Sequence, residues 1–269
     1  MSERISSWKN FEHDDNKIVR EADKVGDQAL DIVDRRYGCG YPSWRPGSHE
    51  LSYHNGHHAR AVGDAALKVC TRMGLSRPEL AVAKAAGYSH DLVQLKGRGR
   101  DENESAEWFE GQLERARVFP EPLRHIGGLA IKGTEPIFSG KRIVGQMATR
   151  LDYPDKDARL LGLGVACGDF GELYTPEGPL LSHQLFREIK GMPREQNIPF
   201  DEITDFQRGQ VQLLETYKYP HPTGESTLAT HRRQVTTFAK TILRQLESGT
   251  IESWPELIER DMSFIRQLR

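Results

Sequence analysis

The feature that most constrains the fold is helical periodicity without strand-like alternation. In residues 16–37, apolar side chains recur at the spacing that gathers them on one helical face: Ile18, Ala22, Val25, Ala29, Ile32 and Val33. Similar spacing recurs along the chain, and no segment shows sustained alternation of period two. The sequence therefore predicts an all-α fold of about ten helices.

Glycine and proline divide the chain into these helical segments. The helix at 16–37 stops at Gly38, the next ends at Gly74, and Ser76 with Pro78 begins a third. Residues 133–140 are expected to form a turn. A fourth helix is expected to begin near Asn103. The remaining helices are expected to cover about 123–131, 141–151, 158–170, 180–190, 201–217, 227–246 and 255–268.

Composition indicates a soluble protein and excludes several functions. The net charge of −2 carries no signal for nucleic acid or an anionic membrane. No apolar run approaches the roughly 18–20 residues that cross a bilayer, and the polar N-terminus lacks a signal-peptide core. Cys39, Cys70 and Cys167 form no CxxC pair and are expected to be reduced. We expect a cytoplasmic protein.

Three of the ten histidines lie in one short segment, at positions 54, 57 and 58. His58 shares a helical column with Val62, Ala65 and Val69, so it should point into the core. His57 shares its column with Asp64 and Lys68, which indicates solvent or the rim of a site. His54, one turn before His58, is expected on the same side.

Two further segments bring acids and a histidine to buried helix faces. His90 and Asp91 follow the small inward residues Ala86 and Gly87, and Asp169 ends a strongly apolar run. A buried carboxylate is costly unless it is paired or binds a metal. Singly, these residues could be a hydrogen-bonded core histidine, a helix cap or a salt-bridge partner. Together, His58, His90, Asp91 and Asp169 predict a divalent metal ion within a helical bundle.

This order of residues resembles the HD superfamily of metal-dependent phosphohydrolases, all-α proteins with a histidine, a His-Asp doublet and a distant aspartate. The segment from Tyr53 to Val62 is similar to the corresponding segment of its cyclic-nucleotide phosphodiesterases. Residues 103–106 (Asn-Glu-Ser-Ala) and 131–134 (Ile-Lys-Gly-Thr) resemble the uncharacterised predicted HD phosphohydrolases more closely. The resemblance covers about residues 50–175.

This sequence also departs from the family's pattern, and the departures narrow the range of expected activities. Only His125 lies between the doublet and Asp169, so a histidine-rich dinuclear site is not expected. Gln94 follows the doublet where guanosine tetraphosphate hydrolases have a Glu-Asp pair, which argues against that activity. We expect a single domain over residues 1–269, with a metal-site core at about 50–175 and C-terminal helices at 180–269 packing on it.

The resemblance implies hydrolysis of a small-molecule phosphoester or nucleotide by metal-activated water. The ion would be Mn, Fe, Co, Ni, Zn or Mg, and Asp91 could bridge to a second, weaker ion. His54 is the candidate general acid, since its intrinsic pKa is near neutral; a capping or supporting role is the alternative. Glu104 is expected either to orient the metal water or to cap a helix.

A basic loop follows the doublet and supplies candidate phosphate contacts. Arg98 and Arg100, with Lys96, could hold a phosphate, although a solvated turn is the competing interpretation. Thr134 is expected on the wall of the site. Two other functions remain open: a di-iron oxygenase of the same fold and a non-catalytic binding protein with a structural metal. We expect no membrane partner and no nucleic-acid binding; the oligomeric state is left open.

Overall fold

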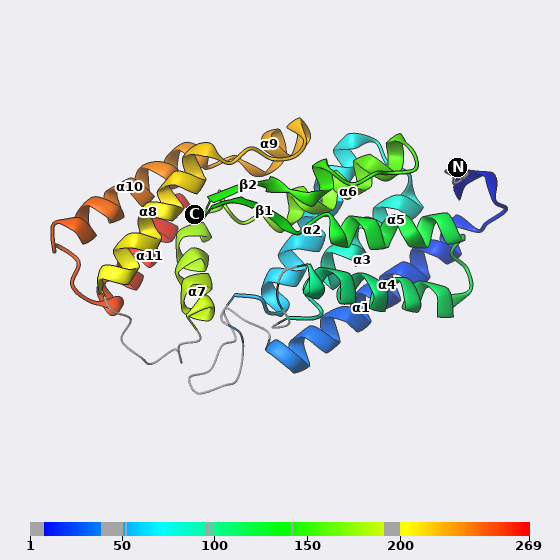
Figure 1. Cartoon of the computed structure of the whole chain (residues 1–269), viewed down its shortest axis with the longest axis horizontal. Helices are drawn as coiled ribbons and strands as arrows, with labels where there is room; N and C mark the ends of the chain where they lie inside the picture. Colours follow the sequence, from blue (N-terminus) through cyan, green and yellow to red (C-terminus); the bar gives the residue numbers. More distant parts are fainter. Residues whose placement is uncertain are drawn as a thin grey trace.

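The computed structural model describes residues 8–38, 51, 53–94, 97, 99–140, 142–190 and 200–269. These residues form eleven α-helices, two short 3-10 helices and one two-stranded sheet, which confirms the predicted all-α class. Figure 1 shows α1–α6 at one end of an elongated molecule and α7, α8, α10 and α11 at the other, with the hairpin between them.

The first six helices build the end of the molecule that carries the N-terminus. Helix α2 packs against both α3 and α6, while α1 packs on α3 and α5 packs on α4 and α6. Their bounds are α1 Asp15–Tyr37, α2 Gly56–Met73, α3 Arg77–Ser89, α4 Arg100–Ala116, α5 Glu121–Lys132 and α6 Lys156–Asp169, and a 3-10 turn at Trp8–Asn10 precedes them.

Local capping sets where α2 and α3 begin. The Asn55 side chain accepts hydrogen bonds from the backbone N–H groups of His57 and His58, and Gly74 ends α2 in the left-handed conformation. Glu79, in the first turn of α3, accepts from the Ser76 backbone and from the Trp8 indole. These caps place His58 in the first turn of α2 and His90 directly after α3.

Small residues let α2, α3 and α6 approach closely. A methyl group built on Gly87 of α3 would lie 2.6 Å from the Cα of Gly63 in α2. One built on Gly168 of α6 would lie 2.6 Å from the Val62 carbonyl oxygen. The backbones therefore touch where the histidine and aspartate residues of these helices converge.

The expected turn at 133–140 and helix at 141–151 are wrong. Residues Pro136–Ser139 (β1) and Arg142–Gln146 (β2) form an antiparallel hairpin that pairs Phe138 with Ile143 and has Gly140 at φ +62° in its turn. A 3-10 turn follows at Met147–Thr149. Each strand is too short to show clear alternation, and β-branched Ile143 and Val144 with Gly145 disfavour a helix.

The C-terminal helices are α7 Gly178–Ile189, α8 Phe200–Thr216, α9 Pro222–Leu228, α10 Arg232–Glu247 and α11 Trp254–Leu268. The single helix expected at 227–246 is in fact divided between α9 and α10. An aromatic cluster connects the two ends of the molecule. Tyr174, Tyr217 and Tyr219 pack with Val69 of α2 and Cys167 of α6 on one side and with Val235 of α10 on the other.

Within the described residues, none of the helices has the length and apolar character needed to span a bilayer. Cys70 and Cys167 are buried free thiols, as expected from their spacing, and Cys39 lies outside the described residues.

Replacing Gly87 with alanine should test the close approach of α2 and α3. The added methyl meets backbone atoms that cannot move independently, so the free energy of unfolding should fall by about 1–3 kcal/mol. Gly111→Ala is the matched control, because a methyl there meets no heavy atom within 4 Å; it should raise that free energy by roughly 0.5–1 kcal/mol. Urea unfolding measures both, and equal stability of the two variants would contradict the close approach.

Candidate metal centre

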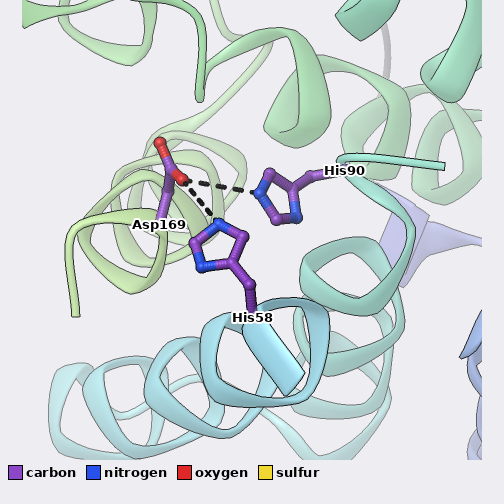
Figure 2. A group of neighbouring side chains, drawn as sticks. All are labelled: His58, His90 and Asp169. Atoms are coloured by element: carbon purple, nitrogen blue, oxygen red, sulfur yellow. Dashed lines mark ion pairs between the residues drawn. The ribbon is translucent and has the colours of Figure 1, made fainter. Parts of the chain in front are cut away.

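Side chains from three helices meet at one buried point. His58 of α2, His90 after α3 and Asp169 at the end of α6 form a group that could hold a metal ion. Asp169 Oδ1 lies 3.6 Å from His58 Nε2 and 3.4 Å from His90 Nε2. Figure 2 shows both imidazoles pointing at this carboxylate. The structure thus brings together three of the four predicted ligands in one group.

Asp91 approaches the same two imidazoles. Its Oδ2 lies 2.9 Å from His90 Nε2 and 3.5 Å from His58 Nε2. Among the described residues, His58 Nε2, His90 Nε2 and Asp91 Oδ2 are buried with no hydrogen-bond partner. Buried polar atoms that lack a hydrogen bond are costly, and three that converge on one point fit the donor set of a divalent ion.

Each of these four side chains is held by a further hydrogen bond on its outer side. His58 Nδ1 donates to Glu172 Oε2 (3.1 Å), and His90 Nδ1 donates to the Gly87 carbonyl (2.8 Å), which leaves both Nε2 atoms facing the cluster. The Gln94 amide donates to Asp91 Oδ1 at 2.6 Å. Such contacts fix ring orientation and tautomer in metal sites.

The fourth of these contacts comes from the hairpin. Gln146, the last residue of β2, donates from its side-chain nitrogen to Asp169 Oδ2 (3.1 Å) and accepts a hydrogen bond from the Tyr217 hydroxyl (3.0 Å). Gln146 is buried. The hairpin, which the sequence had not predicted, therefore connects the Asp169 carboxylate to the aromatic cluster.

The electrostatics of the cluster favour charged imidazoles while no ion is bound. Burial alone lowers the pKa of His58, but the neighbouring carboxylates of Asp169, Glu172 and Asp91 outweigh it and raise that pKa to about 9. For His90 too, the effect of burial is outweighed by Asp91 and Asp169, and the pKa rises well above its usual value. Burial raises the Asp91 pKa, but the charge of His90 more than reverses this and lowers it.

His54 and His57 lie beside the cluster and have different partners. His54 Nδ1 pairs with Glu188 of α7, whose other oxygen accepts hydrogen bonds from the backbone N–H groups of Tyr53 (2.8 Å) and His54 (3.0 Å). His57 is about one-third exposed and contacts Glu172 Oε1 at 3.2 Å; it is not one of the three residues grouped as possible metal ligands.

A cavity of about 660 Å³ opens from the cluster. His54, His90, Asp91, Asp169 and Thr134 line it, and the Thr134 hydroxyl donates to the Ile131 carbonyl (2.7 Å). Glu104 and Arg100 line a neighbouring hollow instead, beside Tyr37 and Trp108. Their expected roles stay predictions. Arg98 and Lys96 lie outside the described residues.

Sequence reasoning missed the acids that support the cluster. Glu172, Glu188 and Glu102 line or contact the site. Glu172 lies three residues after Asp169, a helical spacing that could have indicated it. Glu102 lies two residues before Glu104, the acid that was expected in the site. The residues around them in the sequence do not distinguish one from the other. Nothing in the sequence relates Glu188 to His54, because 134 residues separate them.

No protein-family model matches the sequence, and no curated protein matches it. Among solved structures, the chain is similar to Bacillus subtilis YpgQ, whose crystal structure was determined in complex with ADP. The sequences are 14% identical, the likeness covers 87% of this chain and 96% of that chain, and the TM-score is 0.51. At this identity the similarity shows that the two chains share a fold.

Removing a ligand should remove the metal. His58→Ala and Asp169→Ala should each bind less than a tenth of a stoichiometric ion, because each loses a donor from a small buried group. Elemental analysis of protein purified without chelator measures this. The control, His125→Ala on α5, should keep its full metal content. Full occupancy in either ligand variant would contradict the assignment.

Metal binding should tighten as the pH rises from 6.5 to 9. The pKa of His58 in the metal-free protein is about 9, so below that pH the imidazole carries a proton that the ion must displace. The His90 pKa is raised as well, so its proton must also be displaced, and the apparent affinity should rise by at least about tenfold per pH unit across this range. Chelator competition at several pH values measures this, and calorimetry in two buffers counts the protons released. A pH-independent affinity would contradict the raised pKa.

Proposed function

We propose that this protein is a metal-dependent hydrolase of a phosphoester or nucleotide, of the HD type that its sequence resembles. One observation carries the proposal: three buried side-chain atoms have no hydrogen-bond partner among the described residues. These atoms are His58 Nε2, His90 Nε2 and Asp91 Oδ2, and they lie near the Asp169 carboxylate, beside a cavity. The fold shared with YpgQ, whose structure contains ADP, supports a phosphate-containing substrate, of which nucleotides are one class.

The proposed ligands of the ion are His58, His90, Asp91 and Asp169. Two imidazoles and two carboxylates suit Mn²⁺, Fe²⁺, Co²⁺, Ni²⁺, Zn²⁺ or Mg²⁺ and leave positions open on the ion. When bound, such an ion activates water and polarises a phosphoryl oxygen. Asp91 is also the residue that would hold a second, weaker ion.

His54 is the proposed general acid for the leaving alcohol. Its ring lines the cavity and lies near that of His58, at 5.7 Å between ring centroids. Glu188 contacts both its Nδ1 and its backbone N–H, so the other ring nitrogen, Nε2, is left to donate a proton into the cavity. In the metal-free protein, burial lowers the His54 pKa, but the charges of Asp91 and Glu188 outweigh this effect and raise it. The Glu188 contact does not depend on the ion and favours the protonated ring.

Other residues have proposed supporting roles. Thr134 contributes to the cavity wall, where its hydroxyl is already bonded to backbone. Glu104, Arg98 and Arg100 remain candidates for orienting water or binding phosphate; among the acids of α4, Asp101 and Glu102 line the cavity. We also propose that residues 1–269 act as one unit, since residues of α7 and α8 line the cavity with the metal cluster.

The function is tested with a panel of bis-p-nitrophenyl phosphate, p-nitrophenyl phosphate, alkyl phosphates, mononucleotides and cyclic nucleotides. Elemental analysis and an optical spectrum accompany the assay. Turnover by the metal-loaded protein is expected. If the fully metallated protein hydrolyses none of these compounds, the proposed function is wrong. A di-iron spectrum would favour the oxygenase alternative.

His54→Ala should keep its metal and lose kcat by about 10²–10⁴-fold on an ethyl ester, whose alkoxide needs a proton. The loss of kcat on a p-nitrophenyl ester should be smaller, because the p-nitrophenolate leaving group departs without taking up a proton. Glu188→Gln should show the same dependence on the leaving group with a smaller loss, since it acts through His54. Glu247→Gln, at an exposed position of α10, is the control. Equal losses on both esters would remove His54 as the acid.

A further inference from the structure

The cavity beside the cluster is larger than a phosphate group requires. Its 660 Å³ lies within the range of pockets that enclose most of a small-molecule ligand. At the cluster it is lined by the turn before α2, by the residues after α3 and by the end of α6. On the opposite side it is bounded by the hairpin and by α7 and α8, so the rest of a substrate would extend toward these three elements.

That opposite wall is mainly apolar. The hairpin contributes Phe138 and Ile143, which pair across the two strands, and α7 and α8 add aliphatic and aromatic side chains. Most of these side chains are only half-buried, so they keep apolar surface that a ligand could cover. The side chains from the helices are Leu181, Leu185, Phe206 and Leu213.

Two polar side chains near this wall, Ser182 and Asp205, already have partners. Ser182 donates to Gln210 Oε1 at 3.2 Å, and Asp205 forms an ion pair with Arg208 at 2.6 Å. They are therefore less available to recognise a polar alcohol such as a sugar.

Outside the histidines, the charged side chains that line the cavity among the described residues are all acidic. Asp101, Glu102, Glu172 and Asp205 line it, while no lysine or arginine does so in the described part of the chain. Glu172 contacts His58 at the cluster, whereas Asp205 lies on α8, so an additional phosphate on the organic side of the substrate would face Asp205 and gain nothing from the apolar wall. An uncharged hydrocarbon group is not repelled by a carboxylate and can pack against the apolar wall.

We propose that the substrate is a phosphate monoester of an uncharged, apolar alcohol, with its phosphate at the cluster and its hydrocarbon part against the hairpin, α7 and α8. The proposal rests on the hydrolase function above. Water forms the new bond to phosphorus, and the bond from phosphorus to the alcohol oxygen breaks. That oxygen takes a proton from His54, which is reprotonated from the attacking water, so the products are inorganic phosphate and the alcohol.

The test is a series of ethyl, butyl and octyl phosphates with the protein loaded with Mn²⁺. These esters have nearly the same leaving group, so differences in kcat/KM report binding of the chain. Each buried methylene contributes up to about fourfold, and we expect kcat/KM to rise at least about tenfold from ethyl to octyl. An equal kcat/KM across the series would overturn the proposal. So would a kcat/KM higher than that of octyl phosphate for choline phosphate, a nucleoside monophosphate or a nucleoside triphosphate.

The same assay separates this inference from the hydrolase function. p-Nitrophenyl phosphate is included as a reference ester. If it or ethyl phosphate is hydrolysed without any gain from a longer chain, the hydrolase stands and the apolar substrate fails. If no ester or nucleotide is hydrolysed by the metal-loaded protein, both fail.

Leu185→Asn tests the wall itself. It should lower the octyl-to-ethyl ratio of kcat/KM at least threefold, and Ile143→Thr on the hairpin should do the same if the α7 variant folds poorly. The matched control is Val144→Asn, since Val144 is 58% exposed on β2 and does not line the cavity; its ratio should equal that of the unaltered protein. An unchanged ratio in both wall variants would overturn the proposal.

Discussion

The cost of burying charge where α2, α3 and α6 meet is the constraint on which the rest of the structure depends. Two imidazoles and the carboxylates of Asp91 and Asp169 share this point, and the low dielectric there makes an unpaired charge expensive. Close helix contacts at Gly63, Gly87 and Gly168 bring the side chains together. The same burial leaves atoms without hydrogen bonds among the described residues, which is the strongest physical sign that this group could hold an ion.

The cluster is supported from parts of the chain that are distant in sequence. Gln146 of the hairpin holds Asp169 and accepts a hydrogen bond from Tyr217, and Glu188 of α7 holds His54 and the turn before α2. The C-terminal helices thus do more than cover the core. They contribute to the geometry of the cluster on one side and form the apolar wall of the cavity on the other.

The cavity has two chemically different ends, and each follows from the elements that build it. The cluster end is formed by helix termini, where short polar side chains and backbone carbonyls are available to orient His58 and His90. The opposite end is formed by one face of the hairpin and by side faces of α7 and α8, whose apolar residues Phe138, Leu185 and Phe206 remain partly open. A substrate that uses both ends must itself have a charged part and an apolar part.

The sequence by itself determined the helical class and the inward facing of His58, His90 and Asp169, because apolar columns one helical turn apart specify which face is buried. It could not predict the hairpin at 136–146, whose strands are too short for periodicity and are stabilised by pairing with each other. Only the tertiary structure placed Glu188 against His54 and Gln146 against Asp169 and left Glu104 in a neighbouring hollow. The physical reason is that these contacts join segments tens of residues apart, whereas periodicity describes only neighbours on one helix.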